Sequence, residues 1–146
     1  MIALLQRVSS ARVDIAGETV GAIGPGLLSL VCAEPQDTEA LCQRMLDKIL
    51  KLRIFGDDQG RMNRSLQDVG GGLLIVSQFT LAADTRHGNR PGFTAAAHPD
   101  LGRQLYGHFV ALARASHPQV ETGQFGAEMA VHLVNDGPVT IPLRLG

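Results

Sequence analysis

The stretch Leu73-Leu74-Ile75-Val76 is a continuous aliphatic run that follows three consecutive glycines. A run of this kind, bounded by turn residues, is typical of a central strand that is buried on both faces of a sheet. It leads directly into Ser77-Gln78-Phe79-Thr80, where the aliphatic residues give way to polar ones. Polar residues at the end of a central strand are a common location for a functional site. The alternative is that Ser77 and Thr80 only satisfy backbone groups at the strand end.

The N-terminal third of the chain predicts a sheet with short connections. Apolar or alternating residues indicate strands over residues 2–8, 11–15, 19–23 and 27–32. Ala16-Gly17-Glu18 predicts a hairpin turn, and Gly24-Pro25-Gly26 separates the last two of these strands. A further short strand is expected at Arg53-Ile54-Phe55.

Two amphipathic stretches predict helices. Asp37 is the expected N-cap of the first helix, which runs to about Leu52 and repeats its apolar residues at helical spacing. The second helix is expected to start near Pro99, because proline suits the first turn of a helix. It should end before His117-Pro118.

The C-terminal segment contains a Gly-Pro step, Gly137-Pro138, between two strand-like runs. Proline has no N–H to donate to a sheet, and glycine has no side chain, so backbone carbonyls here could contact a ligand closely. We expect the chain to turn at this step from the run 129–133 into the run 139–141, with Pro142 on an edge strand. Residues 1–146 are therefore predicted to form one α/β domain with a largely antiparallel, barrel-like sheet and two main helices.

Composition excludes several classes of protein. Hydrophobic residues make up 45% of the chain and charged residues 18%, as is usual for a globular protein. The net charge of −1 argues against broad polyanion binding but allows a local phosphate site. No apolar run could span a membrane and Met1–Leu5 is too short for a signal peptide, so a cytoplasmic protein is expected. Cys32 and Cys42 are expected to be buried free thiols.

Charged side chains offer weak candidate sites. Arg86, His87 and Arg90 lie in a glycine-containing loop, where they either contact phosphate oxygens or are simply solvated. Arg7 interrupts an apolar strand. It either points to solvent or points inward, where the backbone carbonyls of an unusual turn would satisfy its charge.

Conventional catalytic motifs are missing from the chain. There is no G-x-S-x-G motif, and the spacing of Ser77, His132 and Asp136 does not require a catalytic triad. The five histidines show no metal-binding spacing, so no metal site is expected. No cofactor is expected either.

Two motifs together resemble the paired signature of D-aminoacyl-tRNA deacylases, namely Ser-Gln-Phe-Thr-Leu at 77–81 and Asn-Asp-Gly-Pro-Val-Thr at 135–140. The resemblance runs nearly from end to end. Further matching segments are 1–8, 53–55, 62–63, 81–85, 90–93 and 122–125, with Leu52 at a position that is tyrosine-like in the family. The occurrence of both motifs in this order, with these flanking segments, is highly specific for the deacylase family.

The resemblance implies a homodimer that hydrolyses the ester between a D-amino acid and the 3′ end of tRNA, with glycyl-tRNA as a related substrate. Gly137 and Pro138 would form a cis element that projects into the pocket of the other subunit. The carbonyls of this element would leave no room for an L side chain. Arg7 would hold the element in place, and Gln78 would help from the opposite side.

The same resemblance places Ser77, Phe79 and Thr80 in the pocket, with main-chain N–H groups near Phe79 and Thr80 receiving the substrate carbonyl. The 2′-OH of the terminal ribose would assist proton transfer. Two alternatives remain open from the sequence. Thr80 could act as a covalent nucleophile, or the protein could be a module that binds RNA ends without catalysis.

Overall fold

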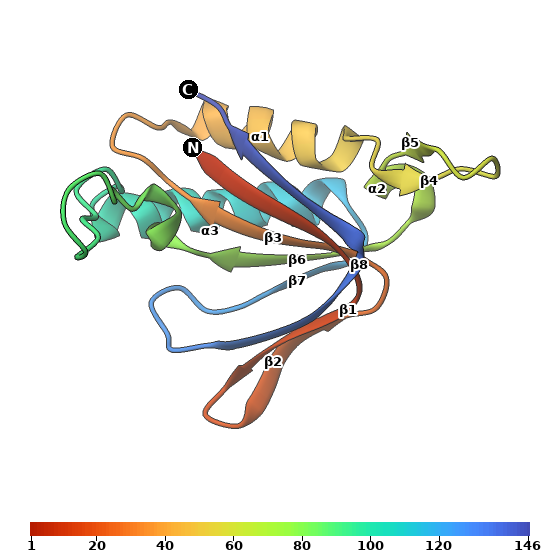
Figure 1. The fold of residues 1–146 in the computed structure, drawn as a ribbon, viewed down its shortest axis with the longest axis horizontal. Coiled ribbons are helices and arrows are strands. Elements are labelled where there is room, and N and C mark those ends of the chain that lie inside the picture. The colour runs from red at the N-terminus through yellow and green to blue at the C-terminus, as the bar shows by residue number, and fades with distance from the viewer.

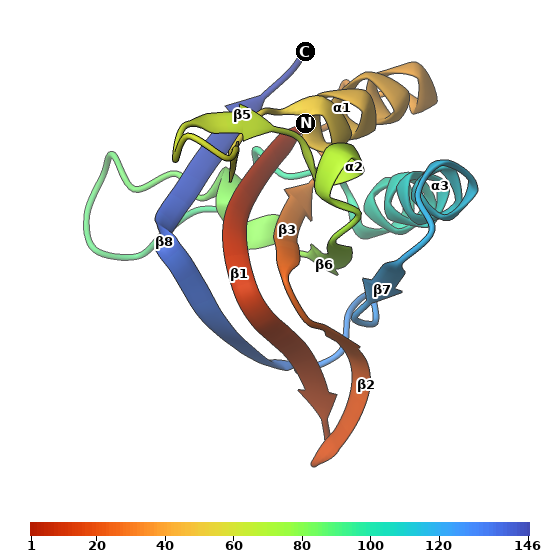
Figure 2. The ribbon, with the colours of Figure 1, turned by 90° about the vertical axis from the view of Figure 1, so that its right-hand side faces the viewer.

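The computed structural model describes all 146 residues and shows a mixed sheet that curls into a nearly closed barrel. The strands are β1 (Ile2–Ile15), β2 (Glu18–Ile23), β3 (Gly26–Cys32), β4 (Phe55–Gly56), β5 (Met62–Arg64), β6 (Gly72–Ser77), β7 (Val120–Thr122) and β8 (Ala130–Arg144). The helices are α1 (Glu39–Lys51), α2 (Leu66–Val69), a 3-10 helix η1 (Phe79–Ala82) and α3 (Pro99–Ser116). The long helices α1 and α3 lie on one face of the sheet, and the two chain ends lie close together (Figures 1 and 2). No helix is both long and apolar enough to cross a membrane.

The sheet follows the path β2-β1-β3-β6-β7, and β8 pairs with β1 outside this path. All pairings of β1 are antiparallel, whereas the β3–β6 and β6–β7 pairings are parallel. The two ends of the path meet where Gly21 of β2 faces Thr122 of β7. A Cβ on Gly21 would lie only 2.5 Å from the carbonyl oxygen of Thr122. The predicted α/β fold, with its barrel-like sheet and two main helices, is confirmed.

Strand β6 is buried on both faces, as its aliphatic run predicts. Leu73 and Ile75 pack into the large core cluster that includes α1 and α3. Leu74 and Val76 point to the other face and join a smaller cluster with residues of β1, β2 and β3. Alternation along an extended chain sends successive side chains to opposite faces, so this strand joins the two halves of the core.

Helix α3 begins at Pro99 and ends at Ser116 as expected, but the N-cap of α1 is Thr38 and not Asp37. The Thr38 side chain accepts a hydrogen bond from the N–H of Leu41 at 3.3 Å. Asp37 is engaged elsewhere, because its carboxylate accepts from the N-terminal ammonium of Met1 at 2.9 Å. A contact between distant parts of the chain therefore decides which of two adjacent capping residues is used.

Two boundaries of the N-terminal half also differ from expectation. Residues 2–8 and 11–15 form one continuous strand, with Ser9 in a bulge where Val8 and Ser10 face consecutive residues of β8. The short strand expected at 53–55 is displaced to Phe55–Gly56. The hairpin turn between β1 and β2 lies where predicted, and Ala16 and Gly17 there adopt φ values of 51° and 81°.

The expected turn at Gly137-Pro138 into a separate strand is wrong. Strand β8 continues through this step and pairs along β1 on both sides of it. Asn135 is opposite Val8 and Thr140 is opposite Gln6, so residues 136–139 all stand against a single residue of β1. The Gly-Pro step therefore lies in a wide bulge, the Gly-Pro bulge (residues 136–139), on an edge strand. The edge position of Pro142 is confirmed.

Candidate active site

The polar segment after β6 forms a tight turn that exposes two backbone donors. The N–H of Gln78 donates to the carbonyl of Val31 at 2.8 Å, and the 3-10 helix η1 begins at the next residue. Phe79 and Thr80 are the first two residues of η1, so their N–H groups have no acceptor within the helix. The Gln78 side chain does not cap them and donates to the Thr80 hydroxyl instead. Two adjacent N–H groups are therefore available to a ligand.

A largely apolar cavity of about 670 Å³ adjoins this segment. Its volume is in the range of small-ligand sites. Ser77, Gln78 and Phe79 line it, whereas Thr80 does not. The chain has five Phe, one Tyr and no Trp. Five of these six aromatic side chains line this cavity: Phe79, Phe93, Tyr106, Phe109 and Phe125.

The sequence motifs did not identify four of these aromatic residues. They come from α3 and from two loops, and only the fold brings them together. The rings of Phe79 and Phe93 stack edge to face with centroids 5.1 Å apart, and the Arg103 guanidinium lies 4.8 Å from the centroid of Phe125. Two signals were available in the sequence. Phe93 and Phe125 lie in segments that match the deacylase family, and aromatic residues are so scarce that few positions could supply rings to a binding site.

Two titratable groups in this cavity are held in their neutral forms. Burial raises the pKa of Tyr106 to about 12, and its hydroxyl donates to the carbonyl of Ile75 at 2.9 Å. Burial also raises the pKa of Cys32, whose Sγ donates to the carbonyls of Ala33 and Phe79 at 3.4 and 3.6 Å. At neutral pH neither group is a base or a charged nucleophile.

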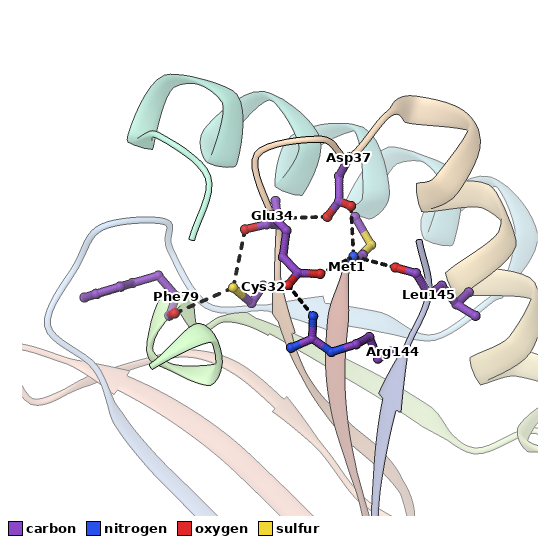
Figure 3. Close-up of polar contacts among 8 residues, drawn as sticks. Met1, Cys32, Glu34, Asp37, Phe79, Arg144 and Leu145 are labelled. Atoms are coloured by element: carbon purple, nitrogen blue, oxygen red, sulfur yellow. Dashed lines mark hydrogen bonds and ion pairs between the residues drawn. The ribbon is translucent and has the colours of Figure 1, made fainter. Parts of the chain in front are cut away.

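Met1, which lines the cavity, belongs to an ionic cluster around the N-terminus (Figure 3). The ammonium of Met1 donates to Glu34 and Asp37 at 2.9 Å and to the carbonyl of Leu145 at 2.7 Å. Arg144 also pairs with Glu34. Partial burial opposes ionisation of Glu34, but these hydrogen bonds prevail and lower its pKa. The cluster ties the segment after β3 to both ends of the chain.

Arg7 points inward, and backbone carbonyls satisfy it. The side chain is only 16% exposed, and its Nε donates to the carbonyl of Asp136 at 3.0 Å. Its Nη1 donates to the carbonyl of Ile54 at 2.8 Å. Arg7 therefore connects the Gly-Pro bulge to the segment after α1.

The Gly-Pro bulge is held from inside as well. The Gly137–Pro138 peptide bond is cis, and Gly137 has a φ of +136° that L residues rarely adopt. The side chain of Asn135 accepts from the N–H of Val139 at 2.9 Å and donates to the Thr140 hydroxyl at 2.8 Å. Asn135 thus closes the base of the bulge. The second motif contains this residue, but its bracing role could not be read from the sequence.

The other side-chain candidates are not assembled into a site. His132 pairs with Asp14 at 3.2 Å and Asp136 with Arg7 at 3.5 Å, so no triad with Ser77 forms. No group of three or more His, Cys, Asp or Glu side chains is placed to hold a metal ion.

In the loop 84–92, both Nε and Nη2 of Arg86 donate to Asp84, and these bonds lower the pKa of that carboxyl to about 2. His87 and Arg90 are exposed and make no ion pair.

A sequence model of the family described as D-Tyr-tRNA(Tyr) deacylase matches residues 4–144. The chain belongs to this family. Proteins named D-aminoacyl-tRNA deacylase are similar to it over 145 residues. The one from Paracidovorax citrulli is 74% identical, covering 99% of this chain and 94% of that protein. The one from Variovorax paradoxus is 70% identical and covers 99% of both chains.

Solved structures show the same deacylase-family fold. One described as c-Myc DNA Unwinding Element Binding Protein superposes with a TM-score of 0.95 and 38% identity, covering 100% of this chain and 99% of that one. Another, a probable eukaryotic D-amino acid tRNA deacylase, has a TM-score of 0.84 at 18% identity and 97% coverage of both chains.

The two motifs of this deacylase-family chain lie apart within the single chain. Arg7, which holds the Gly-Pro bulge, is at the level of Leu73, four residues before Ser77 along β6. At about 3.3 Å per residue, this separates them by about 13 Å along the strands. Gly137 and Pro138 are exposed, and neither lines the cavity of its own chain.

Proposed function

We propose that this protein is a D-aminoacyl-tRNA deacylase, which hydrolyses the ester between a D-amino acid and the 3′ end of tRNA and releases both. The observation that carries the proposal is the pair of unengaged N–H groups at Phe79 and Thr80 beside an apolar cavity. An ester carbonyl bound there would have two donors for the oxyanion that develops during attack by water. Relatives that are 74% and 70% identical bear this activity in their names.

The Gly-Pro bulge is proposed to select against L-amino acids in a homodimer. It is exposed, braced by Arg7 and Asn135, and separated from the cavity of its own chain. These properties suit a rigid wall that enters the cavity of the partner subunit, where Gln78 would contact it. A wall at the α-carbon of the bound aminoacyl group rejects every L side chain. A pocket that recognises side chains instead distinguishes one amino acid from another by only about 1–3 kcal/mol per methylene.

The residues of the cavity suit a reaction that needs little side-chain chemistry. An aminoacyl ester is already activated, so positioning of water and stabilisation of the oxyanion carry much of the rate. Tyr106 and Cys32 stay protonated at neutral pH. Neither can therefore act as a base, and we assign proton transfer to the 2′-OH of the terminal ribose, as the resemblance to D-aminoacyl-tRNA deacylases implies. Glycyl-tRNA has no side chain for the wall to reject and is proposed as a second substrate.

The tRNA is proposed to reach the cavity past the loop 84–92 in the cytoplasm, where the enzyme would act in translational quality control. Of the three phosphate candidates in the loop, His87 and Arg90 are free to bind, whereas Asp84 already neutralises Arg86. His87 and Arg90 are therefore the stronger candidates.

The direct test compares hydrolysis of D-Tyr-tRNA and L-Tyr-tRNA at low enzyme concentration. Equal rates for the two substrates would refute the proposal. A module that only binds RNA ends would retain uncharged tRNA and turn over neither ester. The covalent alternative is separated by Thr80→Ala, which should abolish turnover if Thr80 is the nucleophile and preserve most of it if the main chain does the work.

A pair of substitutions at Phe79 tests the backbone donors themselves. Phe79→Pro removes one N–H at a helix position where proline is tolerated, and loss of one oxyanion donor costs about 10²- to 10³-fold in kcat. Phe79→Ala removes the ring but keeps the donor, so it should retain far more of the kcat. A similar kcat for both variants would contradict the role of the N–H group.

A further inference from the structure

A second cavity, of about 740 Å³, lies between the C-terminal half of α1 and the end of β8. We call it the basic groove because its polar lining is Arg44, Lys48, Lys51 and Arg53 with a single acid, Asp47. Arg44, Lys48 and Lys51 are spaced four and three residues apart, which places them on one face of α1. Lys48 and Lys51 are the only lysines in the chain.

The cations of the basic groove lack acidic partners. Five of the thirteen Lys and Arg side chains make ion pairs, and four of the remaining eight line this groove. Asp47 accepts a hydrogen bond from Gln43 at 3.0 Å and pairs with none of the groove cations. The helix dipole accounts for cations in the last turn of α1. It does not account for Arg44 in the middle of the helix or for Arg53 beyond its end.

The basic groove adjoins the Gly-Pro bulge. Ile54 lines the groove, and its carbonyl accepts from Arg7, which also donates to the carbonyl of Asp136 in the bulge. Ile141, which follows the bulge in β8, lines the groove too. No residue of the groove lines the cavity of the same subunit. A bulge that enters the partner's cavity would therefore bring this groove beside the partner's cavity.

We propose that the basic groove of one subunit binds phosphates of the tRNA whose 3′ end lies in the cavity of the other subunit. This inference rests on the proposed function and adds a second contact to it, so that each tRNA touches both subunits. Unpaired, exposed cations attract a phosphate backbone strongly because counterions are released on binding. Such a local site is compatible with a net charge of only −1.

The test uses Lys48→Gln with Lys51→Gln, and a control with the same loss of charge, Arg12→Gln with Arg114→Gln. Hydrolysis of D-Tyr-tRNA is compared with that of D-tyrosyl-adenosine, which lacks all tRNA phosphates. The groove variant should raise KM several-fold for tRNA, leave kcat unchanged, and leave the adenosine ester unaffected. The slope of log(kcat/KM) against log salt concentration should fall by about 2, one for each phosphate contact removed.

The possible outcomes distinguish a failure of the groove proposal from a failure of the proposed deacylase function. If wild-type protein cleaves both substrates and the groove variant matches the control, the basic groove has no role in binding tRNA. Equal losses on both substrates would mean a structural effect and would also overturn the proposal. Wild-type protein that cleaves neither substrate would instead refute the proposed function.

Heterodimers test whether the groove acts across the interface. One chain carries Phe79→Pro, so that only the other chain has a working cavity, and the two chains are purified through different tags. Neutralising the groove in the chain with Phe79→Pro should raise KM for tRNA, whereas neutralising it in the chain with the working cavity should not. The reverse pattern would overturn the assignment to the partner subunit.

Discussion

The substitution Gly137→Ala tests the Gly-Pro bulge with the smallest possible change. An added Cβ would lie 2.9 Å from Nη2 of Arg7 and 2.9 Å from Cγ2 of Val139. The φ of +136° is also one that L residues rarely adopt, and strain of this type costs about 1–3 kcal/mol. Since 1 kcal/mol shifts the Tm of a domain of this size by about 2–4 °C, we expect Tm to fall by about 2–12 °C.

The same substitution should also weaken chiral selection. Relief of either contact moves Arg7 or the backbone of the Gly-Pro bulge, and both define the proposed wall. We expect the ratio of kcat/KM for D-Tyr-tRNA over L-Tyr-tRNA to fall by about tenfold or more, equivalent to about 1.4 kcal/mol. The assay follows deacylation of both substrates well below the Tm of the variant, so that the folded protein is compared.

Gly24→Ala is the matched control, because Gly24 has no atom within 4 Å of an added Cβ and no positive φ. It should leave both Tm and the D/L ratio nearly unchanged. A Gly137→Ala protein with the wild-type D/L ratio would refute the assignment of chiral selection to this element. A variant that lost stability but kept selectivity would restrict Gly137 to a structural role.

Three further substitutions test other parts of the structure. Glu34→Gln should lower the free energy of unfolding by about 1–3 kcal/mol near neutral pH. Because the folded pKa of Glu34 is lowered, this contribution is present above the ordinary carboxyl pKa and lost as pH falls through the folded value, so melting curves of variant and wild type should converge in acid. Tyr106→Phe should cost about 1 kcal/mol in chemical denaturation through the lost bond to Ile75, yet keep the pH profile of kcat, contrary to an acid–base role. Gly107→Ala should stabilise α3 by about 0.5–1 kcal/mol, since its Cβ meets no atom within 4 Å; a lower Tm would contradict the open space around it.

Hydrophobic periodicity correctly predicted the helices and strands whose pattern of buried residues is visible within the segment itself. The aliphatic run of β6 and the amphipathic stretches of α1 and α3 all formed where expected, because burial of one or both faces is encoded within each segment. The sequence predicts separate strands over 2–8 and 11–15, whereas the structure has one strand β1 with a bulge at Ser9 between them. The bulge depends on pairing with β8, more than 120 residues away along the chain, so no local pattern could have revealed it.

In the candidate site, too, features encoded locally could be predicted, whereas features that depend on tertiary contacts could not. The motifs located the η1 turn and the Gly-Pro step. The sequence left two orientations open for Arg7, and the structure shows the inward one, with backbone carbonyls as partners. The aromatic lining of the cavity comes from elements that follow no common pattern in the sequence. Its assembly depends on how α3 packs against β6, a tertiary contact that the periodicity of each element leaves open.

A site made from main-chain groups would also explain why the chain carries no conventional catalytic motif. The proposed chemistry depends on two N–H groups at the start of a 3-10 helix and on the missing Cβ of a glycine, and neither is a property of a reactive side chain. Substitutions that alter the backbone, such as Phe79→Pro and Gly137→Ala, should therefore damage turnover or selectivity more than removal of the hydroxyl of Ser77 or Thr80. The opposite order, with a hydroxyl deletion as the most damaging change, would return the chemistry to a side-chain nucleophile.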